Sequence, residues 1–286
     1  MHEDKNKKDA SRHKRALEIN AYVVGAGAFG VFFRWMQCQL AFDDLGLPEK
    51  SFWNVMVPLS ILIVGYVFLR FVDKFRNQRY YLPGAFHLAL ENRGRLYAVI
   101  RWAVGGLMCL GALVILATCE TDKHAVLLRV IALLAALTGI SFPLLLASAN
   151  KEKEQLRPRI LCLYSLFPIL LFAAWLIFSY IENAINSVVW GYAIEIITIC
   201  FAMVSFFRVA GFAYGQPNVW LAMFFAMFGA FLCFTSLADS RNVGLQIVLL
   251  SSALMLIVYN WIMVANLRQR DAEDRETPQD GFERLR

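Results

Sequence analysis

Charged residues in this chain are confined to short intervals between long apolar runs. Six runs contain no Asp, Glu, Lys or Arg, and these are residues 52–69, 102–119, 130–149, 160–181, 209–238 and 242–267. Two further runs, 19–42 and 183–207, each hold a single charge, Arg34 and Glu195 respectively. Because a bilayer core about 30 Å thick requires roughly 20 apolar helical residues, these eight runs predict eight membrane-spanning helices.

The composition agrees with a membrane protein. Hydrophobic residues make up 59% of the 286 positions and charged residues only 17%, a balance that lies outside the range of soluble domains. We therefore predict an all-α, polytopic integral membrane protein whose transmembrane domain spans residues 17–267. A basic tail, residues 1–16, precedes this domain, and a charged tail, residues 268–286, follows it.

The distribution of basic residues predicts the orientation. If the N-terminus is cytoplasmic and the spans alternate, 23 of the 28 Lys and Arg residues lie on the cytoplasmic side. Only Lys50, Lys123, Arg129 and Arg241 fall outside, and Arg34 lies within the membrane. This is the positive-inside bias of a cell (cytoplasmic) membrane protein, so we expect both termini in the cytoplasm. It also explains the net charge of +6 without a nucleic-acid partner.

The longest internal connection, residues 73–97, is expected to be cytoplasmic. It mixes aromatic and aliphatic side chains with Arg79, Arg93 and Arg95. Such an amphipathic segment is typical of chain that lies along the membrane surface, with its cations toward anionic headgroups. We predict an interfacial loop there.

A glycine fingerprint in the first span is a false lead. Gly25, Gly27 and Gly30 match the G-x-G-x-x-G spacing of dinucleotide-binding proteins. That motif requires a preceding strand and a surrounding parallel sheet, and the remaining sequence has no such pattern. We expect instead that these glycines let another helix approach closely, as small residues do within lipid.

Two predicted spans carry small or polar residues along one face. In the first span, offsets of three and four residues align Gly27, Gly30, Arg34, Gln37, Ala41 and Asp44. The sixth span repeats the pattern with Gly191, Glu195, Thr198, Ala202 and Ser205. Each face contains one formal charge, so we expect the two faces to point into the protein.

The depths of these two charges also match. Arg34 lies eight residues from Phe42 and Glu195 eight residues from Ser187, which places both about 12 Å below the outer boundary. An isolated charge at that depth costs about 3 kcal/mol, so opposite charges are expected to pair. The pair has two open interpretations: a structural ion pair that fixes helix contacts, or part of a ligand site.

We predict a site for a small solute or ion in an outward-facing polar pocket between the first and sixth spans. Its candidate residues are Arg34, Gln37, Asp44, Glu195 and Thr198. Arg34 would bind an anionic group or hold Glu195, Glu195 would exchange a proton or bind a cation, and Gln37 and Thr198 would orient the ligand. The alternative is a non-transporting membrane subunit that acts as a sensor, scaffold or accessory protein.

Catalytic and metal-binding patterns are missing from the sequence. No His lies inside a predicted span, and neither His-Glu-x-x-His nor Gly-x-Ser-x-Gly occurs. We therefore expect no enzyme activity, no metal ligands and no cofactor. The six cysteines form no Cys-x-x-Cys pair and are expected to be free, with a disulfide among Cys38, Cys119 and Cys233 left open. The expected partners are the bilayer, a small solute or ion, and another membrane protein or second copy.

Overall fold

The computed structural model describes residues 2–42, 52–78, 80–92, 94–121, 123–151, 157–183 and 189–269. Eight long helices run through these ranges: α1 (His2–Leu40), α2 (Trp53–Asn77), α4 (Arg95–Thr118), α5 (Ala125–Ser148), α6 (Pro158–Asn183), α7 (Val189–Ala213), α8 (Val219–Thr235) and α9 (Val243–Ala265). Each is long and apolar enough to cross a membrane. The all-α, eight-helix prediction is confirmed, and the chain is a multi-pass membrane protein.

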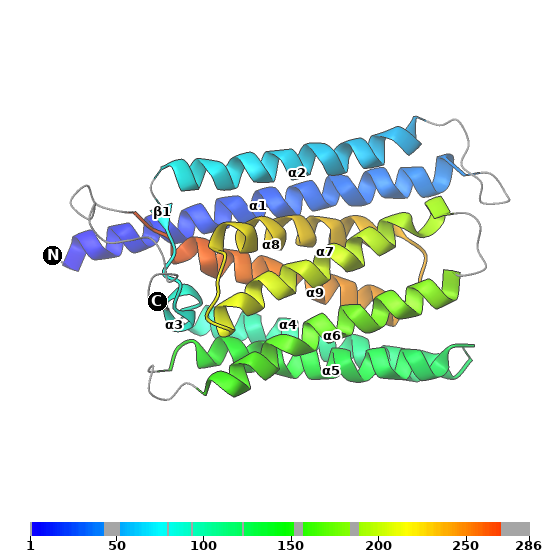
Figure 1. The fold of residues 1–286 in the computed structure, drawn as a ribbon. Helices are drawn as coiled ribbons and strands as arrows, with labels where there is room; N and C mark the ends of the chain where they lie inside the picture. The colour runs from blue at the N-terminus through cyan, green and yellow to red at the C-terminus, as the bar shows by residue number, and fades with distance from the viewer. Residues whose placement is uncertain are drawn as a thin grey trace.

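The helices run up and down in a single bundle (Figure 1). We call the end where α1 begins and α9 finishes the basal end, and the end where α1 finishes and α9 begins the distal end. The protein buries 72% of the apolar 18-residue stretch of α8 and the same share in α9, so these two helices are central. In α2 only 22% of that stretch is buried, so α2 is peripheral. Helix α8 contacts α1, α2, α7 and α9, and α9 also contacts α4.

Two of the three fingerprint glycines lie at a close helix–helix contact. A Cβ atom at Gly27 would come within 2.6 Å of Phe234, and one at Gly30 would collide with Thr235, both at the end of α8. Gly25 has no such neighbour within 4 Å. The α1–α8 contact therefore requires glycine at two positions, as expected for packing in lipid.

Polar side chains add a second α1 contact nearer the basal end. The Nδ2 of Asn260 on α9 donates to the Oδ1 of Asn20 on α1 at 3.0 Å. The Nδ2 of Asn20 in turn donates to the Ala16 carbonyl at 2.8 Å. Both asparagines are buried, so the pair joins α1 to α9 inside the bundle.

Two helices extend beyond the apolar runs that predicted them. Helix α1 begins at His2, so the backbone of residues 2–16 is helical and continuous with the first span. Helix α7 continues past Arg208 to Ala213, so Arg208 is helical rather than part of a loop. A single arginine does not end a helix, whereas the turn at Gly215 (φ 72°) and Pro217 does.

The predicted interfacial loop, residues 73–97, is largely folded into the protein. Strand β1 (Tyr80–Tyr81) pairs with β2 (Arg268–Gln269), and the short helix α3 (Phe86–Ala89) follows. Leu90 is fully buried. The side chains of Leu82, Phe86 and Leu90 are buried against the bundle at the basal end, so protein covers this part of the segment.

Asn92 holds this segment in place. Its Nδ2 donates to the Leu90 and Leu146 carbonyls, both at 2.8 Å, and its Oδ1 accepts from Arg101 Nη1 at 2.9 Å. The Oδ1 of Asn150 accepts from the Asn92 backbone N–H at 2.9 Å. These bonds join the segment to α4 and to the end of α5.

Candidate functional site

A cluster of four charged side chains lies at the distal end of the bundle. The distal charge cluster consists of Arg34 on α1, Glu195 on α7, and Asp239 and Arg241 in the connection between α8 and α9. The 3₁₀ turn η3 (Ser236–Ala238) leads directly into this connection. Two cations and two acids give the cluster a formal charge of zero.

Arg34 forms the more enclosed half of the cluster. It is 1% exposed, and its Nε donates to Asp239 Oδ1 at 2.6 Å. Its Nη1 donates to Gln37 Oε1 at 2.6 Å, and Gln37 Nε2 donates to Asn54 Oδ1 on α2 at 2.9 Å. This chain of bonds joins α1, α2 and the α8–α9 connection.

Among the described residues, Arg34 thus contacts the carboxylate of Asp239 and not that of the predicted Glu195. Within the described residues, Glu195 reaches Arg34 only through Arg241 and Asp239. Arg34 and Glu195 still lie equally far from the distal ends of their helices. Arg34 is six residues before the end of α1, and Glu195 is six residues after the start of α7. Two charges at one depth can pair with different neighbours when a charged connection passes between them.

Arg241 forms the second half of the cluster. Its Nη2 donates to Ser236 Oγ at 2.7 Å and to Asp239 Oδ2 at 2.8 Å, and lies 3.8 Å from Glu195 Oε2. Its Nε and Nη1 are buried and have no hydrogen-bond partner among the residues that the structure describes. A buried donor left unpaired costs about 1–3 kcal/mol, so an acceptor placed beside these two nitrogens would stabilise the cluster.

Trp175 on α6 completes this half. Its indole Nε1 donates to Glu195 Oε1 at 3.1 Å, and the Arg241 guanidinium carbon lies 5.9 Å from the ring centroid. The Glu195 side chain is 17% exposed, against 7% for Arg241. The carboxylate is therefore the most accessible group of the cluster, and an aromatic ring flanks the guanidinium.

The other predicted site residues do not all contact the distal charge cluster. Gln37 joins the cluster through Arg34. Thr198 does not, because it is fully buried and its Oγ1 donates to the Leu232 carbonyl on α8 at 3.3 Å. Asp44 lies outside the described residues, so the structure gives it no place.

Sequence reasoning missed Asp239, Arg241 and Trp175 as members of the cluster. A signal existed for each of them. Asp239 and Arg241 lie in a three-residue interval between two apolar runs, which confines both charges to the membrane boundary. The indole of Trp175 lies within an apolar run, where its N–H requires an acceptor.

All six cysteines are free thiols in this structure. The described residues contain no group of three or more His, Cys, Asp or Glu that could hold a metal ion.

Fold and cluster together define a class: a multi-pass α-helical membrane protein with a charged cluster at one end of its bundle. The chain has no significant match to a family model, a curated protein or a solved structure.

Proposed function

We propose that the protein binds a small solute or ion carrying an anionic group at the distal charge cluster, and moves it across the membrane. The observation that carries the proposal is Arg241, whose side chain is 7% exposed while two of its donor nitrogens have no partner in the described part of the chain. An anionic oxygen would satisfy these donors through charge-assisted hydrogen bonds. Trp175 and Glu195 would form the opposite wall of the site.

The charge pattern supports an orientation for this site. The basal end carries most of the Lys and Arg residues, as the cytoplasmic side of a cell membrane protein does. In our proposal the basal end faces the cytoplasm and the distal charge cluster faces outward. No catalytic role, metal or cofactor is part of the proposal.

In our proposal the solute passes along the α7–α8 interface, which contains polar contacts. Glu195 lies near the distal end of α7 and Arg208 near its basal end. Between them, Thr198 Oγ1 donates to the Leu232 carbonyl and Ser205 Oγ donates to the Phe225 carbonyl, both on α8. In membrane proteins, polar residues within spans often mark substrate pathways, and a rearrangement of this α7–α8 contact would open one.

A second candidate is a non-transporting membrane subunit. The observation that favours it is the Arg34 half of the cluster, where the guanidinium is 1% exposed and bonded to Asp239 and Gln37. Such a closed ion pair can specify which helices meet without binding any ligand.

The deciding experiment compares the purified wild type with Arg241→Gln, using chloride, acetate, succinate and glutamate as probes. A solute that binds the folded state adds about 2.7 kcal/mol to the free energy of unfolding when its concentration is 100 times its Kd. This stabilisation raises the melting temperature. We expect at least one probe to stabilise the wild type and to be taken up by reconstituted vesicles, and Arg241→Gln to abolish both effects.

Arg129→Gln is the matched control, because Arg129 is an exposed arginine at the same distal end. It should keep the wild-type response. If Arg241→Gln lowers the melting temperature while every probe acts on it as on the wild type, the subunit alternative stands and the binding proposal fails.

A further inference from the structure

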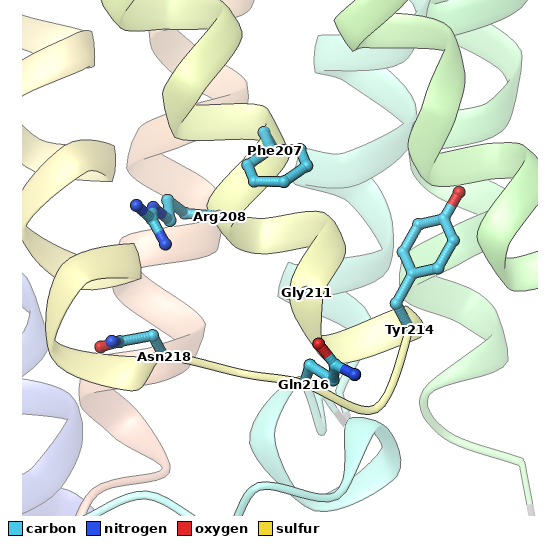
Figure 2. Close-up of a pocket in the computed structure, with 6 residues that line it drawn as sticks. All are labelled: Phe207, Arg208, Gly211, Tyr214, Gln216 and Asn218. Carbon is cyan, nitrogen blue, oxygen red and sulfur yellow. The ribbon is translucent and has the colours of Figure 1, made fainter.

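A pocket at the basal end lies far along α7 from the distal charge cluster. It has a volume of about 480 Å³ and is formed where α7 ends and α8 begins. Its lining residues are Phe207, Arg208, Gly211, Tyr214, Gln216 and Asn218. Figure 2 shows Arg208 and Asn218 on one side, Tyr214 on the other, and Gln216 in the turn between them. The volume falls in the range of small-molecule sites.

Arg208 supplies the only formal charge among these lining residues. Among the described residues, its buried Nε has no hydrogen-bond partner and its side chain forms no ion pair. The guanidinium carbon lies 5.8 Å from the Phe225 ring centroid. A cation within a membrane-spanning helix costs about 3 kcal/mol, and a pocket beside it without an acid leaves that charge available to an external anion.

The other polar groups of the pocket are suited to an anion as well. The Oδ1 of Asn218 accepts from the Leu221 backbone N–H at 3.3 Å, so its Nδ2 remains available as a donor. Gln216 and Tyr214 add exposed amide and phenol donors. Helix α8 begins at Val219, next to Asn218, and its N-terminus contributes positive partial charge.

The rim of the pocket is aromatic. Phe207 is 59% exposed and Tyr214 is 53% exposed. An exposed Tyr near a span end is typical of the bilayer interface, where headgroup phosphates lie. The pocket thus combines an unpaired guanidinium and several donors with an apolar rim at headgroup depth.

We propose that this basal pocket binds a phosphate group. Arg208 bonds the phosphate oxygens, and Gln216 and Asn218 donate to them from the turn. The rim favours a phospholipid headgroup as the carrier, with its acyl chains alongside Phe207, and free phosphate shares the same binding chemistry.

The test measures the affinity of the purified full-length chain in detergent for two probes, short-chain phosphatidylglycerol and inorganic phosphate. We expect Arg208→Gln to weaken binding at least tenfold and Arg208→Lys to restore part of it. The matched control is Arg159→Gln, because Arg159 is an exposed arginine at the basal start of α6, and it should leave the affinity unchanged.

Gln216→Glu provides a second variant if Arg208→Gln does not fold. Gln216 is exposed, so the change is tolerated by the fold, yet it places a carboxylate inside the pocket and should repel phosphate, again by tenfold or more. Saturable binding of the lipid alone or of both probes, lost in these variants, supports a lipid carrier; binding of inorganic phosphate alone supports the phosphate site and removes the lipid. Binding of neither probe, or binding equal in all variants, overturns the proposal.

Discussion

The two arginines of the distal charge cluster differ in how completely they are bonded. Arg34 has a carboxylate and an amide oxygen at 2.6 Å. Arg241 bonds its neighbours through Nη2 alone, and its other two nitrogens have no partner among the described residues. Removing one partner of a closed pair exposes the other to the full cost of burial, so Arg34 is expected to act on stability and Arg241 on ligand binding.

A double-mutant cycle tests the assignment of Asp239 to Arg34. We expect Arg34→Gln and Asp239→Asn to show a coupling energy of about 2–3 kcal/mol, because the two groups are in direct contact. The cycle between Arg34→Gln and Glu195→Gln should give a smaller value, since Arg241 and Asp239 lie between them. The measurement is thermal or denaturant unfolding in detergent. A larger coupling to Glu195 than to Asp239 would contradict the structure.

Replacing Glu195 tests the binding half of the cluster. Glu195→Gln retains an oxygen that can accept from Trp175 but removes the negative charge 3.8 Å from Arg241. An anion bound by Arg241 then meets less repulsion, so its affinity should rise roughly fivefold or more, equivalent to about 1 kcal/mol. Acetate titrations followed by the melting temperature measure this change. An unchanged or weaker acetate response would count against an anion at Arg241.

At the residue scale, the sequence identified the buried charges but not their partners. Arg34 and Glu195 stood out because each was alone in an apolar run. Asp239 lay one residue beyond such a run, and helix ends read from sequence are uncertain by about a turn. Whether a boundary charge faces solvent or folds inward depends on the path of the connection, here the turn η3, which apolar periodicity does not encode.

At the scale of elements, the α1–α8 contact depends on missing side chains. Gly27 and Gly30 let the backbone of α1 approach Phe234 and Thr235. Hydrophobic burial does not distinguish helix from lipid inside a membrane, so such close packing supplies much of the energy of association. The expectation that these glycines serve packing rather than a nucleotide is confirmed for two of the three.

Gly30→Ala should therefore destabilise the bundle by about 2 kcal/mol or more, because the added methyl group collides with Thr235. Gly25→Ala is the matched control on the same helix, since its Cβ would meet nothing within 4 Å. Alanine is the better helix former, so this control should be neutral or stabilise by up to about 1 kcal/mol. Melting temperatures in one detergent compare the two. Equal effects would show that α1 does not pack closely on α8.

The basal segment, residues 80–92, offers a second test at this scale. Its burial was not predictable from its amphipathic composition, because its partners lie far along the chain in Leu146 and Asn150. The composition of this segment indicates that it has an apolar side and a cationic side. Whether lipid or protein covers the apolar side depends on the tertiary structure.

Asn92→Ala is expected to lower the free energy of unfolding by about 2–3 kcal/mol, since it leaves two buried carbonyls and Arg101 without a partner. Asn77→Ala, an exposed change at the same end of the bundle, should stay within about 0.5 kcal/mol of the wild type. Unfolding followed by tryptophan fluorescence reports both. A similar small effect for Asn92→Ala would show that the segment is not held by these bonds.

At the scale of the whole molecule, the number of spans was predictable and their arrangement was not. Run length against bilayer thickness fixes the count. In lipid, outward and inward faces are both apolar, so hydrophobicity does not reveal that α8 and α9 are central. The more specific signal was a stripe of small residues on α8, Ala222, Ala226 and Ala230, all of which are fully buried.

The sidedness of the bundle gives the last prediction. Eight spans place the start of α1 and the end of α9 at the same end, and the basic residues gathered there favour the cytoplasm. In a cysteine-free background, single cysteines at Lys123 and Ser240 are exposed at the distal end, and those at Lys151 and Tyr214 at the basal end. A membrane-impermeant maleimide should label the distal pair in intact cells, and the basal pair only after permeabilisation. The reverse labelling pattern would mean that the orientation is inverted and that the distal charge cluster faces the cytoplasm. Labelling of only one member of each pair in intact cells would contradict the bundle itself, because the two members of a pair lie at the same end of it.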